Sequence, residues 1–287
     1  MTHQAPGDGP APDLEVFSQV SAVRARTAGT FPPAADAGTF DAEISDEWTI
    51  VGKANGGYLL ALMGRAALSL AGAGHVVAAS AHYLRSPGTG PVEIEGELLR
   101  RGRTVTQVRT RIAQDGRLCA EALMSISELD PCTASGLNAG LPATEPVPFE
   151  DCPRLPSTTT DGFKVAIMDQ VDLRLDPDWS GVIRGLPSGR GELRGWLKLP
   201  RDEDFDPVSL LYAVDAFPPV TFDLQPSAWA STIELTVYVR ALPAPGPVRI
   251  VTRAGLLESP WVDGTCHVWD TTGRLVAQAT QLNKVLA

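Results

Sequence analysis

The stretch 55–70 reads NGGYLLALMGRAALSL, and its apolar side chains surround the helix that it predicts on almost every side. A helix that is apolar all round has to be enclosed by protein. The wider apolar stretch, 56–74, is about the minimum length for crossing a bilayer, and Arg65 and Ser69 interrupt it, so we do not expect a membrane span. The stretch therefore predicts a buried helix at the centre of a globular fold.

The segments that follow this helix show the alternation that is typical of antiparallel strands. In 92–98, Val92 and Ile94 share one face, and three glutamates occupy the other. A strand with one apolar and one charged face belongs to a sheet with one side on the core and one side in water. Gly116 and Gly273 lie between such strands, where hairpins would turn.

The same order of elements occurs twice: one or two strands, an apolar helix and four strands. The matching segments are Tyr83-Leu84-Arg85 with Tyr238-Val239-Arg240, Gly90-Pro91-Val92 with Gly246-Pro247-Val248, and Asp115-Gly116-Arg117 with Thr272-Gly273-Arg274. Their offset stays within 155 to 157 residues, which indicates an internal duplication. The helix of the second copy is expected at about 207–217, because Pro218 cannot continue it.

An antiparallel sheet curled around one buried helix is the hotdog arrangement. Two copies in one chain predict an α+β double hotdog, in which two antiparallel sheets each wrap a central buried helix. The Pro-rich segment 131–160 shows no periodicity and predicts a linker. We therefore expect a flexible tail at 1–15, an N-terminal hotdog at 16–130, this linker, and a C-terminal hotdog at 161–287.

Charge and composition argue against several classes of partner. The net charge of -10 and the pI near 4.9 would repel a phosphate polymer, so neither nucleic acid nor an anionic membrane is an expected partner. The cysteines at 119, 132, 152 and 266 and the histidines at 3, 75, 82 and 267 are scattered, so no metal site is expected. The first residues lack the basic start and apolar run of a secretory signal, which favours a cytoplasmic protein.

Asp215 is the most unusual residue of the second predicted helix. It is a carboxyl group among apolar residues, next to Val214 and Ala216 near the end of the helix. Burial and a helix C-terminus both disfavour the anion, so the pKa of Asp215 should rise toward the range of a useful general base. The alternative is an Asp that reaches solvent or caps the following turn.

Two further polar residues lie on predicted strands of the second half. Gln281 shares a strand face with the apolar Ala277 and Ala279, so its amide either braces the core or orients a ligand. Thr232 offers a hydroxyl at the entry of another strand. By alternation the side chains of Thr232 and the apolar Ile233 lie on opposite faces of the strand. Thr232 would therefore face a buried site only if a bulge altered the strand there.

The segment Asn55-Gly56-Gly57-Tyr58 opens the first helix, where free N–H groups and the positive end of the helix dipole can bind a carbonyl oxygen or a phosphate. The glycines would allow close approach of a ligand, although they equally suit a tight turn or a close helix–sheet contact. Arg103 belongs to the densest basic cluster, which is a candidate for binding ligand phosphates or a solvated hairpin tip.

In order and spacing, these motifs resemble the acyl-CoA thioesterase II (TesB-like) family over most of 40–287. The segments that carry the resemblance are Asn55-Gly56-Gly57-Tyr58, Tyr83-Leu84-Arg85-Ser86-Pro87, Gly102-Arg103 followed by Gln114-Asp115-Gly116-Arg117, Asp215-Ala216-Phe217-Pro218-Pro219, Ser231-Thr232-Ile233-Glu234-Leu235-Thr236, and Gly273-Arg274-Leu275-Val276-Ala277 with Gln281. In that family an Asp, a Thr or Ser and a Gln hold the attacking water. The resemblance assigns these roles to Asp215, Thr232 and Gln281.

The resemblance implies hydrolysis of fatty-acyl-CoA to free acid and coenzyme A, without a metal or redox cofactor. Arg103 and residues 55–58 are the expected substrate-binding residues, and a homodimer or larger assembly is expected, since hotdog proteins bury sheet edges or faces by pairing. One alternative is a non-catalytic acyl-CoA binding or scaffold protein of the same fold. A hotdog enoyl-CoA hydratase is disfavoured, because no Asp-x-Asn-x-x-His pattern occurs.

Overall fold

The apolar stretch forms one 16-residue helix, α2 (Gly56–Ala71), as the sequence predicts. Asn55 caps its start, because the Asn55 Oδ1 accepts the Tyr58 N–H at 2.9 Å. Gly72 ends the helix with a φ of 83°, a left-handed conformation that favours glycine. Most of the side chains between these caps are buried, so the helix is enclosed by the rest of the fold.

The structure is a computed structural model that describes residues 13–26, 36–129, 141, 145–159, 162–225, 229–258 and 260–285. Most of the predicted tail and about half of the predicted linker lie outside these residues. The boundaries expected there stay predictions.

In the described residues, each half contributes to the large sheet two strands before its helix and four strands after it, and β3 pairs with β4 in a separate two-stranded sheet. The main elements of the first half are β1 (Arg24–Ala25), β2 (Ala37–Ile44), α2, β5 (His75–Tyr83), β6 (Gly90–Arg101), β7 (Thr106–Gln114) and β8 (Arg117–Ser127). Those of the second half are β9 (Asp172–Leu175), β10 (Glu192–Lys198), α4 (Ser209–Ala213), β11 (Ala230–Val239), β12 (Val248–Glu258), β13 (Trp261–Trp269) and β14 (Leu275–Val285). The predicted duplication is therefore present in the order of the elements.

Short elements connect these parts. They are α1 (Phe17–Val20), η1 (Asp46–Trp48), β3 (Thr49–Ile50), β4 (Lys53–Ala54), η2 (Phe149–Asp151), α3 (Ile167–Gln170), η3 (Pro177–Arg184), η4 (Pro200–Asp202) and η5 (Val220–Asp223). Gly116 turns the β7–β8 hairpin at a φ of 69°, and Gly273 turns the β13–β14 hairpin at a φ of 78°. Both hairpin predictions are confirmed.

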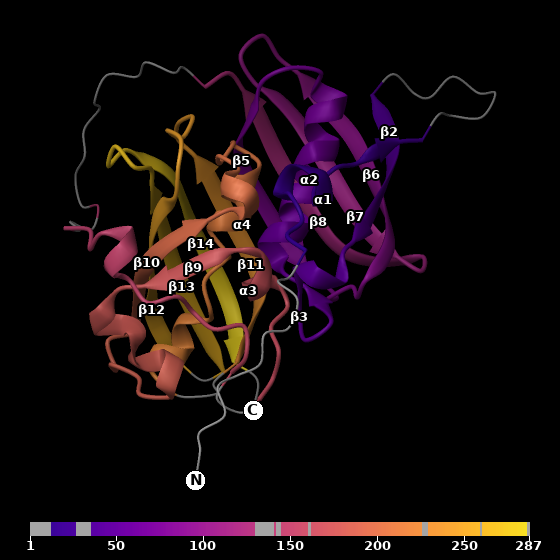
Figure 1. Cartoon of the computed structure of the whole chain (residues 1–287). Coiled ribbons are helices and arrows are strands. Elements are labelled where there is room, and N and C mark those ends of the chain that lie inside the picture. Colours follow the sequence, from indigo (N-terminus) through magenta and orange to yellow (C-terminus); the bar gives the residue numbers. More distant parts are fainter. Residues whose placement is uncertain are drawn as a thin grey trace.

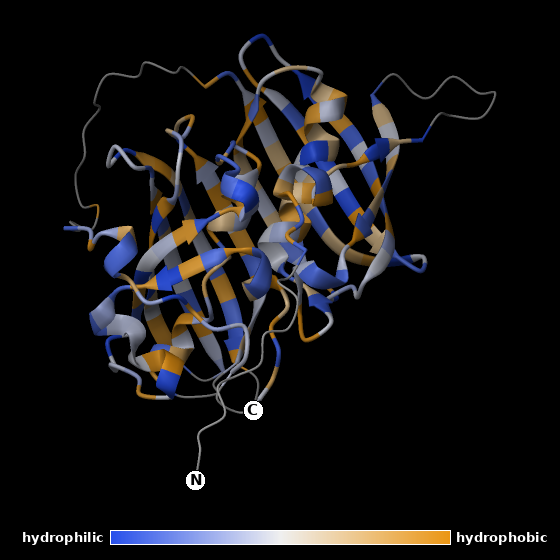
Figure 2. Cartoon of the chain, viewed as in Figure 1, coloured by the Kyte–Doolittle hydropathy of each residue, from blue (hydrophilic) through white to orange (hydrophobic). Residues whose placement is uncertain are grey.

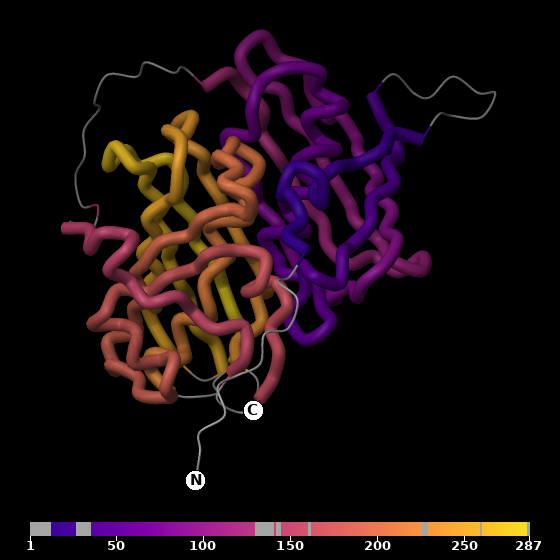
Figure 3. Tube along the Cα trace, viewed as in Figure 1, coloured from indigo at the N-terminus to yellow at the C-terminus, as the bar shows by residue number. Residues whose placement is uncertain are grey.

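The two expected sheets are one continuous sheet, which corrects the prediction. Its twelve strands run in the order β1-β2-β6-β7-β8-β5-β11-β14-β13-β12-β10-β9. The join is antiparallel pairing between β5 and β11, in which Ser80 lies opposite Thr236 and Ala78 opposite Tyr238. Pairing of this kind removes the two edges that separate sheets would have exposed. Figures 1 and 3 show the first half and the second half of the chain side by side across this join.

The helices α2 and α4 cover the same face of the sheet (Figure 1) and pack against each other. Gly64 of α2 lies so close to α4 that an added Cβ would stand 2.9 Å from the Leu211 Cδ1. Apolar residues dominate α2 and alternate with polar ones along the strands (Figure 2). One buried core therefore includes residues from both halves.

The second helix is shorter than predicted. It was expected at 207–217, but α4 covers five residues and ends at Ala213. Val214 and Asp215 form a turn, and the Asp215 N–H still donates to the Tyr212 carbonyl at 3.0 Å. Asp215 consequently lies just beyond the helix, where the chain turns toward the start of α2.

Candidate active site

A cavity of about 550 Å³ lies where the two halves meet. The first half lines it with Ile50, Val51, Lys53, Ala54, Asn55, Gly56, Leu59, Tyr83, Arg85 and Ser86. The second half lines it with Val214, Asp215, Phe217, Pro218, Pro219, Trp229, Ala230, Ser231, Thr232, Thr252, Gln281 and Asn283. The cavity therefore brings together all three residues predicted to hold water, together with the start of α2.

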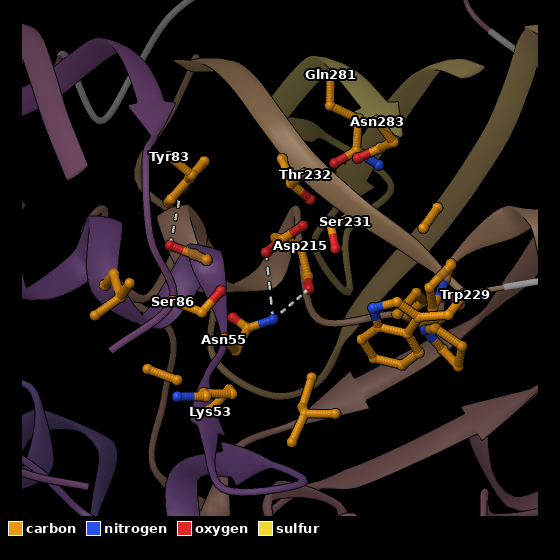
Figure 4. A pocket seen from close by; sticks show the side chains of 18 of the residues that line it. Lys53, Asn55, Tyr83, Ser86, Asp215, Trp229, Ser231, Thr232, Gln281 and Asn283 are labelled. Carbon is orange, nitrogen blue, oxygen red and sulfur yellow. Dashed lines mark hydrogen bonds between the residues drawn. The ribbon is translucent and has the colours of Figure 1, made fainter. Parts of the chain in front are cut away.

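The carboxylate of Asp215 is held against the start of α2. Its Oδ2 accepts the Gly57 N–H at 2.8 Å and the Asn55 Nδ2 at 3.2 Å, and Asn55 Nδ2 also donates to the Asp215 carbonyl at 3.0 Å. Figure 4 shows the two Asn55 contacts and the carboxylate directed into the cavity. These contacts orient one carboxylate oxygen on the helix and leave the other facing the cavity.

The two glycines at the start of α2 make this approach possible. A Cβ on Gly56 would stand 2.9 Å from the Asp215 Oδ2, and one on Gly57 would stand 2.9 Å from the Asp215 Cβ and from the Leu211 and Tyr212 carbonyl oxygens. Real Cβ atoms do not approach other heavy atoms so closely. The sequence left open what the glycines serve, and the structure shows that they admit the Asp215 side chain and α4.

The environment of Asp215 raises its pKa from 3.8 to about 6. Burial is the largest cause, because the anion loses its hydration, while the hydrogen bonds from Gly57 and Asn55 act in the opposite sense. From the sequence, we expect this rise from burial and from the end of the residue's own helix. The structure adds the positive start of α2, which favours the anion and limits the rise.

Tyr83 extends the hydrogen bonding of Asp215 through a peptide unit. The Tyr83 hydroxyl donates to the Gly56 carbonyl at 2.8 Å, and the N–H of the same peptide is the Gly57 N–H that binds Asp215. Hydrogen bonds at both ends of one peptide polarise each other. Burial, followed by the charge of Asp215, raises the pKa of Tyr83, so its hydroxyl stays protonated and remains a donor.

Thr232 reaches the cavity because β11 contains an irregularity. Its pairing with β14 shifts register between Thr232, opposite Asn283, and Glu234, opposite Leu282, so Ile233 is the extra residue. This is the bulge that the parity of Thr232 required. In Figure 4 the Thr232 side chain points toward Asp215.

Gln281 lies on β14, opposite Leu235 of β11 and Gly264 of β13. Its Oε1 is buried and has no hydrogen-bond partner among the residues that the structure describes. A buried amide oxygen without a partner is costly, and a bound water or substrate would satisfy it. Of the two interpretations left open for this amide, the orientation of a ligand therefore fits the cavity better.

Not every predicted substrate-binding residue lies at the cavity. Asn55 and Gly56 line the cavity. Gly57 does not line it, but its N–H donates to the Asp215 carboxylate, which does. The Tyr58 side chain is fully buried among the aromatic residues Phe17, Trp48 and Tyr212 of the core, and its hydroxyl donates to the Val20 carbonyl at 2.8 Å. Tyr58 therefore supports the fold rather than lining the site.

Arg103 also lies away from the cavity. Its hairpin connects β6 and β7, and the neighbouring Arg101 donates to the Ala71 carbonyl at the far end of α2. Sixteen helical residues place that end about 24 Å from Asn55. The basic residues that do line the cavity are Lys53 and Arg85, neither of which was predicted as a substrate-binding residue.

Several residues that line the cavity were not predicted. Tyr83 and Arg85 lie in one of the segments that resemble the family, a signal that could have found them, whereas no local pattern marks Lys53, which precedes the start of α2 by three residues. Within the described residues, no three His, Cys, Asp or Glu side chains are grouped as metal ligands would be. Among the described helices, none has the length and apolar character needed to span a membrane.

Comparison with known proteins agrees with this geometry. Two family profiles match the chain: the Acyl-CoA thioesterase N-terminal domain over residues 44–127 and the Acyl-CoA thioesterase C-terminal domain over residues 149–285. The uncharacterized protein Rv0499 of Mycobacterium tuberculosis is 30% identical over 268 residues, which make up 86% of this chain and 91% of the relative.

Solved structures support the same relationship. A candidate thioesterase II from Thermobifida fusca superposes with a TM-score of 0.81 and 32% identity, covering 96% of this chain and 100% of that one. A protein of hot dog fold from Alicyclobacillus acidocaldarius has a TM-score of 0.76 and 21% identity, covering 94% and 98%, and shows the fold alone. With both profiles matched in order along one double-hotdog chain, this protein belongs to the acyl-CoA thioesterase family.

Proposed function

We propose that this protein hydrolyses acyl-CoA thioesters by direct attack of water, with Asp215 as the general base. The observation that carries the proposal is the carboxyl of Asp215, whose pKa is raised by burial to about 6 in a cavity that it shares with Thr232 and Gln281. A base with a pKa near neutrality is both ionised and basic enough to take a proton at pH 7.

In the proposed reaction, Thr232 and Gln281 hold a water molecule beside Asp215. The ionised carboxylate accepts one proton of this water while the water oxygen attacks the thioester carbonyl carbon. The Gly56 N–H has no acceptor among the described residues and lies at the positive start of α2, so it suits the oxyanion. The C–S bond then breaks, and the proton on Asp215 passes to the departing thiolate.

The two sides of the cavity suit the two ends of an acyl-CoA. Lys53 and Arg85 are exposed on the first-half side, and Lys53 forms no ion pair with any described residue, so both suit the phosphates of coenzyme A. Leu59, Val214 and Phe217 provide apolar surface for acyl carbons. Each methylene buried there would favour binding by about 0.8 kcal/mol.

Two rival functions make different predictions. A hydratase needs a histidine near the substrate, and no histidine is among the described residues that line the cavity. A non-catalytic acyl-CoA binding protein would keep the cavity without turnover. The buried, unpaired Gln281 Oε1 in the same cavity as a carboxyl of raised pKa favours catalysis, because binding alone does not require a base.

The decisive experiment measures thiol release from acyl-CoAs of increasing chain length, with purified protein and a thiol reagent. We expect release by the wild type and a loss of 100-fold or more in Asp215→Asn, in the range lost with a general base. Asp115→Asn, an exposed carboxyl on the β7–β8 turn, is the matched control and should retain activity. Tight acyl-CoA binding without thiol release by the wild type would instead establish the binding protein.

A cytoplasmic location and a homodimer or larger assembly form part of the same proposal. Leu123, Tyr238 and Leu282 are exposed on the outer face of β8, β11 and β14, where a second copy would bury them. Light scattering should give a mass of at least twice the 30.4 kDa chain. A monomer at micromolar concentration would contradict the expected assembly.

A further inference from the structure

The sheet wall of the cavity continues beyond Gln281 with two more polar side chains. Asn283 and Thr252 both line the cavity, and each residue is only 5% exposed. Within the described part of the chain, neither side chain has a hydrogen-bond partner. In Figure 4 Asn283 lies beside Gln281 and Thr232 at the cavity. Their polar atoms are accessible only from the cavity, and amides and hydroxyls in such places are rarely left without a partner, so these two groups indicate a ligand with hydrogen-bonding capacity of its own.

The sheet register places these groups relative to the proposed water site. Asn283 follows Gln281 by two residues on the same face of β14, which separates them by about 7 Å. Thr252 lies on β12, in the row that runs through Cys266 to Ala279, two strands or about 10 Å from β14. Asn283 is also paired opposite Thr232 of β11, so it lies beside the proposed water, whereas Thr252 lies farther into the second half, on the other side of Gln281.

Gly264 leaves space between these groups. It lies on β13 directly opposite Gln281, and its neighbour on the same face is Cys266. A Cβ built on Gly264 would stand 3.4 Å from the Gln281 Cγ and 3.5 Å from its Nε2, so a larger side chain would fill the space beside the amide. An acyl group can therefore extend from Gln281 across Gly264 toward Thr252.

The rest of the cavity indicates that the acyl group occupies the space that runs from Gln281 across Gly264 toward Thr252. Lys53 and Arg85, which suit the phosphates of coenzyme A, belong to the first half and lie at the exposed side. Val214 and Phe217 supply apolar surface that would contact alkyl carbons. The part of the cavity that suits the acyl group thus combines apolar contacts with polar groups on the sheet. A plain alkyl chain would leave these polar groups without hydrogen-bond partners.

We propose that the preferred substrates are acyl thioesters whose acyl group carries a hydroxyl, oxo or amide group, recognised by Asn283 where the group lies near the thioester and by Thr252 where it lies farther along the chain. This inference rests on the proposed thioesterase function and refines its substrate class. A site built to hydrogen-bond a substrate group discriminates strongly against the analogue that lacks the group.

The test compares octanoyl-CoA with hydroxyoctanoyl-CoAs that carry the hydroxyl at each carbon from 3 to 7. We expect kcat/KM to be at least tenfold higher for one or more of the hydroxylated substrates. Asn283→Leu should lower this ratio by about tenfold for a hydroxyl near the thioester, and the nearly isosteric Thr252→Val should do so for a hydroxyl farther along the chain. Thr280→Val removes an exposed hydroxyl from β14 and serves as the matched control that leaves the ratio unchanged. Circular dichroism and thermal melting check that each variant is folded.

Calorimetric titration of the Asp215→Asn variant with the same acyl-CoAs measures their binding without turnover. It therefore separates this inference from catalysis. Tighter binding of a hydroxylated acyl-CoA, lost in the double variant with Asn283→Leu, supports the substrate class even if the wild type releases no thiol. Absence of thiol release from every substrate overturns the proposed hydrolysis. Thiol release with equal rates for octanoyl and all hydroxyoctanoyl groups overturns the inference alone. Variants that weaken every substrate equally also overturn it, because Asn283 and Thr252 would then bind the shared pantetheine arm.

Discussion

At the level of single residues, the proposed chemistry depends on how Asp215 is solvated. Its carboxyl is removed from water, which favours the neutral acid, and it accepts hydrogen bonds from Gly57 and Asn55, which favour the anion. The balance leaves the pKa at about 6 rather than far above neutrality. A carboxyl of this kind is ionised at pH 7 yet more basic than an exposed aspartate.

The first prediction concerns the cost of ionising Asp215. Its pKa is 3.8 in the unfolded chain and about 6 in the folded protein, so the folded state binds more protons between these values. Stability contributed by the neutral acid is complete below pH 4 and is lost as the pH rises through 6. Asp215→Asn should therefore raise the free energy of unfolding by about 1–3 kcal/mol at pH 8 and leave it nearly unchanged at pH 4. Urea unfolding at both pH values measures the difference.

Asp115→Asn provides the control for that measurement, because it removes an exposed carboxyl and should not alter stability selectively at pH 8. The kinetics carry the same sign: kcat/KM of the wild type should increase as the pH rises through about 6, where Asp215 becomes ionised. Equal stability of wild type and Asp215→Asn at pH 8 would show that ionising this carboxyl costs nothing in the fold.

The second prediction tests the peptide between Tyr83 and Asp215. Tyr83→Phe removes the donor to the Gly56 carbonyl, which weakens donation by the Gly57 N–H to the carboxylate. The pKa of Asp215 should then rise, and the acid limb of the kcat/KM profile should move to higher pH by about 0.5–1 unit, equivalent to about 1 kcal/mol. Tyr58→Phe, which also loses a buried hydroxyl but lies in the core, should leave the limb in place.

At the level of secondary structure elements, the site depends on irregular features where elements end or shift. α4 ends after five residues, so Asp215 lies in a turn beyond it, and β11 contains an extra residue that directs Thr232 into the cavity. Straight continuation of either element would reorient these side chains. The start of α2 completes the arrangement, because two glycines allow it to lie against α4.

The third prediction follows from this close contact. In Gly57→Ala the new Cβ would lie 2.9 Å from the carbonyl oxygens of Leu211 and Tyr212, so α2 and α4 must separate. We expect a loss of about 1–3 kcal/mol in stability, typical of overpacking, and a larger proportional loss of activity, because the Gly57 N–H moves away from Asp215. Thermal melting and kcat/KM at pH 8 measure the two effects.

Gly88→Ala is the matched control for this substitution. Gly88 does not adopt a positive φ, and its added Cβ would be in ordinary contact, 3.5 Å from the Gly52 carbonyl oxygen. This variant should keep both stability and activity close to the wild type. Wild-type activity in Gly57→Ala would show that the close approach of α2 to Asp215 is not required.

At the level of the whole molecule, the two halves share a sheet, a core and a site. β5 and β11 pair across the middle of the sheet, and the buried core includes residues from both halves. The candidate site takes Asn55 and Gly56 from one half and Asp215, Thr232 and Gln281 from the other. Neither half alone contains the complete site.

The fourth prediction is that the halves unfold together. Calorimetry should show one transition whose calorimetric and van't Hoff enthalpies agree, with an enthalpy of about 200 kcal/mol for a chain of this length. Val237→Pro, at the centre of β11 where it pairs with Ala79 and Ala279, should lower the melting temperature of the whole protein. Two separate transitions in the wild type would show that the join contributes little to the fold.

Much of this organisation is predictable from patterns in the chain. The apolar character of 55–70 required an enclosed helix, alternation in segments such as 92–98 required an antiparallel sheet, and the repeated segments required two copies. An acid among apolar neighbours also marked Asp215 as unusual. Such inferences succeed because burial imposes a local periodicity on the residues of each element.

Contacts between distant segments do not leave such a pattern. Pairing of β5 with β11 made one sheet where two were expected, and nothing in the sequence marked Lys53, Arg85 or Asn283 as neighbours of Asp215. Tyr58 and Arg103 were predicted as binding residues because of their neighbours along the chain. Tyr58 lies in the core, and the hairpin of Arg103 lies at the far end of α2, about 24 Å from Asn55. Periodicity reports which face of an element is buried, whereas the residues that meet at a site depend on the packing of elements far apart in the chain.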